Sequence, residues 1–163
     1  MRELSLEYLN LDPFSMIGKD WCLITAGTQE KWNTMTASWG FMGVMWNKNC
    51  IMATVRPNRY THEFLKNNEL FTVSFFENEY RKALAFCGSH SGRDCDKAKE
   101  TGLVPLFTDN TVTFEQAKIV FVCRKIFTMD MDPDCLDTEL NKQYNSDPIH
   151  TEFIGEILKV LAK

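Results

Sequence analysis

The sequence lacks the features that mark several large classes of protein. No stretch of it approaches the ~20 apolar residues of a membrane-spanning helix, and residues 1–5 lead into no apolar signal-peptide run. The net charge of -4 argues against general nucleic-acid binding, because neutralising phosphates takes clustered Lys and Arg. We therefore expect a cytoplasmic protein with neither a nucleic-acid nor a membrane partner.

Metal-binding and disulfide patterns are also missing. The six cysteines are scattered with no C-x-x-C pair, and the three histidines have no metal-ligand spacing with one another or with cysteine. We expect reduced, mostly buried thiols and no metal site. An alternative, Cys87 as a nucleophile with His90 or His150, is disfavoured because no paired general base is evident.

What the sequence does contain is a series of short β-rich runs. Strands are predicted over 20–28, 34–38, 50–55 and 69–76, within 111–128, and over 150–161, where the right half also fits a helix. Short helices are predicted over 60–67, 79–86 and 94–101, with a loop at 87–92 and a surface segment at 130–147. Six or seven strands with short helices between them favour a mainly β (α+β) fold, closed or nearly closed into a barrel, over a doubly wound sheet. Because no repeat or linker is found, we expect residues 1–163 to form a single domain.

Two segments carry residues that suit a bound ligand. In the strand that starts at Asn33, alternation places the hydroxyls of Thr34, Thr36 and Ser38 on one face, where they suit the polar edge of a planar heterocycle. A polar face turned to solvent explains the same pattern. Arg56 and Arg59 precede a predicted helix with Thr61 in its first turn, an arrangement suited to a phosphate. Solvated surface charges are the alternative there.

A third segment, residues 87–97, places small donors and cations where a loop meets a helix. It contains Ser89, Ser91, Gly92, Arg93 and Lys97. Such loops bind anions because their donors converge without bulky side chains in the way. The G-x-x-x-x-G-K-[ST] spacing of a P-loop is missing, and no G-x-G-x-x-G follows a strand, which disfavours a Rossmann site.

Taken in order, these segments resemble the flavin reductase-like family, the flavoredoxin-like FMN-binding split barrels. The resemblance extends from about Trp21 to the last strand. It rests on four motifs, which are N-T-M-T-A-S-W-G at 33–40, R-P-N-R-Y-T at 56–61, C-G-S-H-S-G-R-D-C-D-K at 87–97 and D-P-I-H-T-E-F-I-G-E-I at 147–157. Each motif is weak alone, but four in the family's order are specific.

The resemblance implies a split β-barrel that binds FMN and forms a homodimer with the cofactor close to the interface. It implies that the strand residues lie beside the isoalloxazine ring and the two basic segments beside the ribityl chain and phosphate. The implied FMN contacts are Asn33, Met35, Thr36, Ala37, Ser38, Trp39, Arg56, Arg59, Tyr60, Thr61, Ser89, Ser91, Arg93 and Lys97. His150 resembles a family residue near the open face of the flavin and is the candidate catalytic residue. Pro148 and Ile149, which stand between Asp147 and His150, depart from the family pattern.

The implied activity is that of an oxidoreductase. Bound FMN would accept hydride from NAD(P)H at N5 and pass electrons to flavin or another acceptor. The sequence shows no segment dedicated to a nicotinamide nucleotide, so an alternative stays open, an FMN-dependent electron-transfer protein that a redox protein reduces without NAD(P)H turnover. A flavin-sensing module without turnover is a third hypothesis.

Overall fold

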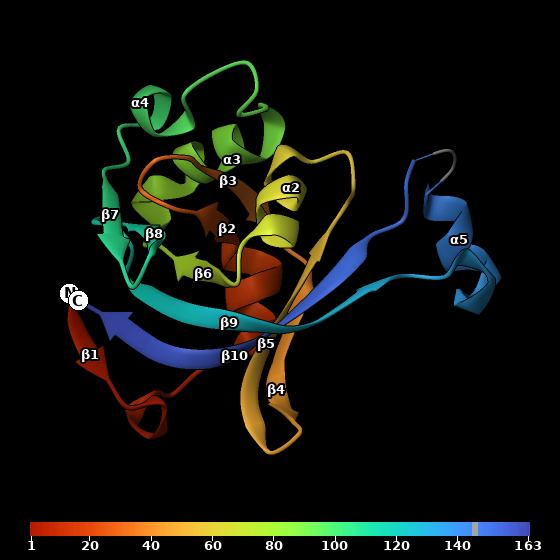
Figure 1. Ribbon diagram of the computed structural model, residues 1–163, viewed down its shortest axis with the longest axis horizontal. Coiled ribbons are helices and arrows are strands. Elements are labelled where there is room, and N and C mark those ends of the chain that lie inside the picture. The colour runs from red at the N-terminus through yellow and green to blue at the C-terminus, as the bar shows by residue number, and fades with distance from the viewer. Residues whose placement is uncertain (145–146) are drawn as a thin grey trace.

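The computed structural model describes residues 1–144 and 147–163, and antiparallel strands dominate it (Figure 1). The strands are β1 (Arg2–Leu4), β2 (Cys22–Gly27), β3 (Trp32–Ala37), β4 (Gly40–Met45), β5 (Lys48–Val55), β6 (Leu70–Phe75), β7 (Pro105–Thr108), β8 (Thr111–Phe114), β9 (Ile119–Asp130) and β10 (Thr151–Ala162). The helices are α1 (Pro13–Ser15), α2 (Tyr60–Asn67), α3 (Arg81–Ser89), α4 (Lys97–Thr101) and α5 (Thr138–Tyr144), with single turns η1 (Leu6–Tyr8), η2 (Met16–Asp20), η3 (Asn78–Tyr80) and η4 (Pro133–Cys135).

The main sheet is a barrel that stays open at one seam. Its strands follow the order β3-β2-β6-β9-β10-β5-β4, each antiparallel to the next, with β1 paired to β10. β3 and β4 therefore lie at opposite edges, although only Ser38 and Trp39 separate them along the chain. Since the three Cα steps from Ala37 to Gly40 span at most about 11 Å, the sheet must curl until its edges approach each other. No ladder joins β3 to β4 among the described strands, which confirms the mainly β, split-barrel fold expected from the sequence.

The seam depends on one glycine. Gly40 has a φ of +155°, and a Cβ atom there would lie 2.5 Å from the carbonyl oxygen of Met52 on β5. A side chain at this position would clash with the neighbouring strand, so glycine is required where β4 starts its ladder with β5. The preceding residue, Trp39, is held at the seam with 53% of its surface exposed.

Two groups of buried apolar side chains stabilise the barrel and fix the helices on it. The larger group fills the curled sheet and includes Phe71, Phe121 and Phe153, and Leu65 joins it from α2. The second lies beneath α3 and α4 and includes Leu84 of α3. Helices α2 and α3 thereby both pack on β2 and β3, so the beginning of one and the end of the other converge beside β3.

Several boundaries differ from the sequence predictions. The predicted helix over 60–67 matches α2, but α3 continues through Ser89, so residues 87–89 are helical and the predicted loop starts later. α4 begins at Lys97 instead of residue 94, because the carboxylate of Asp96 accepts bonds from the amides of Ala98 and Lys99 and caps the helix there.

Other elements were not expected. Strands β1, β4 and β7 were absent from the prediction, and the right half of 150–161 is strand throughout. The predicted surface segment 130–147 contains η4 and α5, which project from the barrel (Figure 1), while residues 145 and 146 lie outside the described part. No helix in residues 1–144 or 147–163 is long and apolar enough to cross a membrane.

Candidate functional site

A small basic cavity forms where β3, the start of α2 and the end of α3 meet. Its volume is about 120 Å³. Eight of the residues implied to contact a cofactor line it, namely Asn33, Met35, Arg59, Tyr60, Thr61, Ser89, Ser91 and Lys97. Asn58, Cys87, His90 and Gly92 complete the lining. We call this space the basic cavity.

The start of α2 supplies one wall of the basic cavity. Pro57 disfavours helix at Arg56, and a turn closed by the Arg59 amide and the Arg56 carbonyl, 3.0 Å apart, leads into the helix. The guanidinium of Arg59 donates to the carbonyl of Gly88, 3.3 Å away, and links α2 to the end of α3. The hydroxyl of buried Thr61 accepts a 2.8 Å bond from the Asn33 amide, which ties α2 to β3.

Lys97 is the most deeply buried cation at the basic cavity, with 6% of its surface exposed. Its ammonium donates to the carbonyls of Thr34 at 2.8 Å and Cys87 at 2.7 Å. These bonds use two of its three donors. Burial lowers the pKa of Lys97, although the carbonyl dipoles around it favour the charged form.

Gly92 allows the turn after α3 to approach β3 closely, because it has no side chain. The close contact is with Asn33, opposite Gly92. A Cβ atom on Gly92 would lie 1.9 Å from Oδ1 of Asn33, so a larger residue would displace this buried amide. We expect Gly92→Ala to lower the free energy of unfolding by about 1–3 kcal/mol, because it breaks the Asn33–Thr61 hydrogen bond. Urea denaturation measures this effect. Gly18→Ala is the control, since a Cβ there has no neighbour within 4 Å, and equal losses in the two variants would contradict the prediction.

Two donors of the third sequence segment are already engaged within the protein. The hydroxyl of Ser89 donates to the Ala85 carbonyl at 2.9 Å, as helix-terminal serines often do. Arg93 pairs with Glu63 and lies over the ring of Tyr60 at 4.5 Å. It does not line the basic cavity but a neighbouring cavity of about 490 Å³. The nearby thiol of Cys87 is not a nucleophile at neutral pH, because burial raises its pKa to about 11.

The threonine hydroxyls of β3 do not form the open row that the sequence suggested. Thr34 shares a 2.8 Å bond with the hydroxyl of Thr25 on β2, and Thr36 donates to the Leu84 carbonyl on α3 at 2.5 Å. Ala37 is buried in the barrel core. Because β3 is an edge strand, the groups it offers to a neighbour on its free side are those of its backbone.

Three other predicted residues, Trp39, Arg56 and His150, meet the unpredicted Tyr144 beyond the other end of β3. The ring centroids of Trp39 and His150 lie 5.2 Å apart, and Nδ1 of His150 is 2.8 Å from the hydroxyl of Tyr144. Arg56 lies over the Tyr144 ring at 5.5 Å. We call these four residues the His150 cluster. Burial, followed by the charges of Arg56 and Arg59, lowers the pKa of His150 to about 4, so the imidazole is neutral at pH 7.

Sequence reasoning missed two members of this region. Tyr144 follows no motif, and Asp147, which forms a 2.5 Å ion pair with Arg56, was considered only as part of the fourth motif. The D-P-I-H sequence signals the neighbourhood of Asp147 and His150, but no local pattern signals Tyr144. Beside Trp39 lies a cavity of about 490 Å³ whose lining, which includes Ser38, Phe14 and Phe41, contains no charged residue. We call it the apolar cavity.

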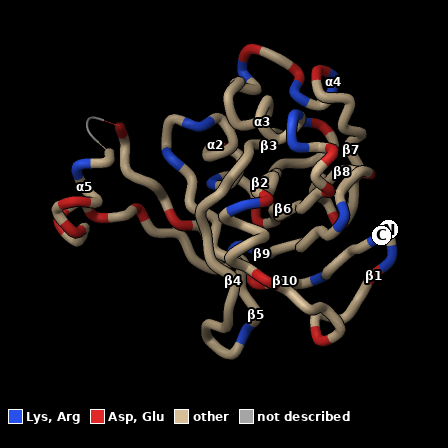
Figure 2. The backbone as a smooth tube through the Cα atoms, turned by 180° about the vertical axis from the view of Figure 1, so that it is seen from behind, with Lys and Arg blue, Asp and Glu red and all other residues tan. Residues whose placement is uncertain are grey.

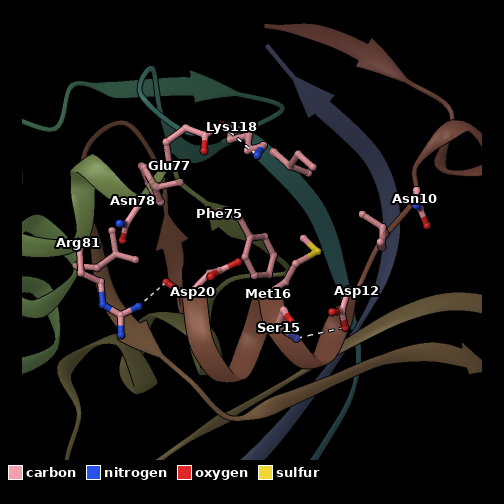
Figure 3. Close-up of a pocket in the computed structure, with 14 residues that line it drawn as sticks. Asn10, Asp12, Ser15, Met16, Asp20, Phe75, Glu77, Asn78, Arg81 and Lys118 are labelled. Carbon is pink, nitrogen blue, oxygen red and sulfur yellow. Dashed lines mark hydrogen bonds and ion pairs between the residues drawn. The ribbon is translucent and has the colours of Figure 1, made fainter.

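A further cavity of about 380 Å³ lies between η2, the end of β6 and the start of α3 (Figure 3). None of the residues implied to bind a cofactor lines it. Its cations are already engaged, since Arg81 donates to the carbonyls of Lys19 and Asp20 and Lys118 pairs with Glu77. Asp12 and Asp20 add negative charge, so this cavity does not suit an anionic ligand.

Comparison with known proteins places the chain in a family. The model of the family described as flavin reductase like domain matches residues 15–163, and the chain belongs to this family. This confirms the resemblance noted in the sequence. A search of curated proteins found no match.

Three solved structures illustrate the shared fold. A flavoredoxin from Methanosarcina acetivorans is 22% identical with a TM-score of 0.71, over 88% of this chain and 68% of that chain. An FMN-binding protein from Thermus thermophilus, solved with 1-cyclohex-2-enone, is 17% identical with a TM-score of 0.72, over 99% of this chain and 80% of that chain. An NADH:FAD oxidoreductase from Streptomyces globisporus C-1027 is 16% identical with a TM-score of 0.68, over 88% of this chain and 75% of that chain.

Proposed function

We propose that the protein binds FMN, with the phosphate in the basic cavity and the ring beside β3, and acts as a flavin oxidoreductase. The observation that carries this proposal is the environment of Lys97. Its buried ammonium contacts carbonyl oxygens, and no carboxylate pairs with it among the described residues. A buried charge without a counter-charge is costly. A phosphate in the basic cavity would supply the counter-charge, with Arg59 and Ser91 as further donors.

The two ends of the site match the two ends of FMN. Asn33 at the start of β3 lines the basic cavity, and Trp39 lies two residues past the other end of the strand. The strand from Asn33 to Ala37 spans roughly 13 Å. Its free edge offers backbone groups to a heterocycle, in place of the threonine hydroxyls, which bond within the protein.

The His150 cluster suits a hydride donor. Bound FMN supplies a two-electron acceptor, and N5 is the atom that takes hydride from NAD(P)H. The exposed face of Trp39 offers a flat apolar surface for a nicotinamide ring. Neutral His150 adds a polar group without adding a charge, and its Nδ1 is already engaged with Tyr144.

One observation favours the electron-transfer alternative. The phosphates of NAD(P)H need cationic partners, and the described lining of the apolar cavity has none. A redox protein that reduces the flavin directly needs no such partners. This alternative keeps the same FMN site and differs only in the electron donor.

We also propose that the protein is a homodimer. Residues 38–47, which include β4, carry no charge, and Phe41, Val44 and Trp46 are 70%, 74% and 54% exposed. Contiguous exposed apolar surface of this kind marks an interaction site. A second copy would present the same uncharged surface and form a symmetric interface.

Anaerobic reduction tests the proposed activity. We expect purified protein to bind added FMN. Under anaerobic conditions, NADH or NADPH should then bleach the visible absorbance of the bound flavin, because hydride transfer reduces the ring. Bleaching by a reduced iron–sulfur protein, with none by either nucleotide, would select the electron-transfer alternative. A protein that ignores added FMN would refute both.

A further inference from the structure

His62 is a buried titratable side chain that the proposed function does not use. It lies in the first turn of α2 with 7% of its surface exposed. Its Nε2 is 2.8 Å from the hydroxyl of Thr151, the first residue of β10. That hydroxyl is in turn 2.6 Å from a carboxylate oxygen of Asp130, the last residue of β9. A continuous series of hydrogen bonds therefore joins α2 to two strands of the barrel.

The chemistry of these three side chains assigns the donor in each bond. A carboxylate only accepts, so the single hydroxyl proton of Thr151 points to Asp130. The Thr151 oxygen then accepts from His62, whose imidazole carries its proton on Nε2. Burial lowers the pKa of His62, which keeps the ring neutral at pH 7. We call His62, Thr151 and Asp130 the His62 network.

The His62 network holds the first turn of α2 between β3 and β10. Thr61 accepts from Asn33 on β3, and the next residue, His62, donates to Thr151 on β10. The side chains of Thr61 and His62 are both buried. Arg59 directly precedes this turn and lines the basic cavity together with Thr61. The position of the turn therefore decides where two groups of the basic cavity lie.

The same network reaches the His150 cluster. Thr151 directly follows His150, and in the sheet it lies between Val55 of β5 and Asp130 of β9. Arg56 follows Val55 and opens the turn from β5 to α2, whose two basic residues are blue in Figure 2. Two members of the His150 cluster are thus chain neighbours of residues paired at Thr151. The network therefore connects the His150 cluster to the first turn of α2.

We propose that His62 is a positioning residue that holds the basic cavity and the His150 cluster in their relative places through Thr151 and Asp130. His62 lines none of the cavities described above, so it acts through α2 and β10 and not on a ligand. Lys125 of β9 donates to two carbonyls in the last turn of α2, so losing the network loosens the first turn without detaching the helix. The inference rests on the proposed function in taking the FMN phosphate as the ligand of the basic cavity.

Two variants of similar volume test the network through FMN affinity. His62→Leu removes the donor to Thr151, whereas His62→Gln keeps an N–H donor of similar reach. We expect FMN binding, followed by flavin fluorescence, to weaken about tenfold in His62→Leu and to stay within about twofold of the parent in His62→Gln. Riboflavin lacks the phosphate and should lose much less affinity in His62→Leu. Equal losses in the two variants, or for the two flavins, would refute the proposal.

Thr151→Val breaks the same network at its middle residue with little change in shape. If His62 acts through Thr151, the double variant His62→Leu, Thr151→Val should bind FMN no more weakly than the weaker single variant. Thr72→Val is the matched control, because it removes another buried hydroxyl, which donates to the Val112 carbonyl at 2.6 Å. It should lower stability and leave FMN affinity unchanged. Additive losses in the double variant, or a loss of FMN affinity in Thr72→Val as large as in Thr151→Val, would contradict the proposal.

The histidine ring nitrogens give a readout that needs no flavin. In the flavin-free parent, ¹⁵N spectra should show His62 protonated on Nε2. The His150 ring resonances should shift in His62→Leu and stay in place in His62→Gln, although no hydrogen bond or ring contact joins the two histidines in residues 1–144 and 147–163. Unmoved His150 resonances in His62→Leu would show that the network does not reach the His150 cluster. A parent that binds no FMN but shows these shifts would refute the proposed function and leave the positioning role of His62 intact.

Discussion

Replacing Lys97 with methionine is expected to weaken FMN binding by about 10- to 100-fold, or roughly 1–3 kcal/mol, the range for a hydrogen bond to a charged group. Methionine keeps most of the volume of the buried stem but removes the charge that the phosphate would meet. Quenching of flavin fluorescence during titration measures the dissociation constant. Circular dichroism checks that the variant stays folded, since the carbonyls of Thr34 and Cys87 lose their donor.

Two controls isolate the phosphate contribution. Lys99→Met changes an exposed lysine on the same helix and should leave affinity unchanged. Riboflavin lacks the phosphate, so its binding should fall much less than that of FMN in the Lys97 variant. Equal losses for FMN and riboflavin would place the effect of Lys97 on the fold of the site and contradict the phosphate assignment.

The elements that sequence could predict are those whose residues are both locally patterned and buried. Helix α2 was predicted to its exact ends in Tyr60–Asn67 because apolar spacing and the preceding Arg56-Pro57 give the same boundary. Strand β4 was missed because its sequence, GFMGVM, contains two glycines and shows no alternation of polar and apolar residues. Its pairing with β5 is set by the chain reversal at residues 46–47, both of which have positive φ.

The candidate site divides in the same way. The basic cavity was predictable because Arg59 and Thr61 lie at the start of α2 and Lys97 at the start of α4, and helix starts favour anions. The direction of the Thr36 hydroxyl was not predictable, because it depends on α3 packing against β3 from 48 residues away along the chain. Tyr144 could not be predicted for a similar reason, since the projecting segment that holds α5 brings its hydroxyl to His150.

The split in the barrel also follows from a feature that sequence pattern does not reveal. Ser38 and Trp39 connect the two edge strands, and this link is too short for the sheet to stay flat. Strand count alone fits an open or a closed sheet equally well. The link draws the edges together and leaves Trp39 between them, next to His150. The seam of the barrel and the proposed flavin site are therefore one place in the fold.

The flavin-free protein should begin to lose stability as the pH falls below 6.5, which is well above the pKa values of ordinary carboxylates. The pKa of His150 is about 4 in the folded protein against 6.5 for an ordinary histidine, because of burial and the charges of Arg56 and Arg59. Below pH 6.5 the unfolded chain binds a proton that the folded protein does not bind, so stability falls as pH falls. The loss reaches at most about 2 kcal/mol by pH 5 and at most about 3 kcal/mol by pH 4, since solvent screening weakens the effect of the Arg56 and Arg59 charges. Urea denaturation at a series of pH values measures it.

The variant His150→Gln assigns this loss to one side chain. Glutamine does not titrate, so the fall in stability between pH 6.5 and 5 should become shallower in the variant, whatever its stability at pH 7. A smaller slope should remain, because burial also lowers the pKa of His62, which bonds to Thr151 at 2.8 Å. His90→Gln is the matched control, since His90 lies on the surface. The same slope in His150→Gln as in the parent would mean that His150 takes up its proton as readily in the folded protein as in the unfolded chain, and the lowered pKa assigned to His150 would then be wrong.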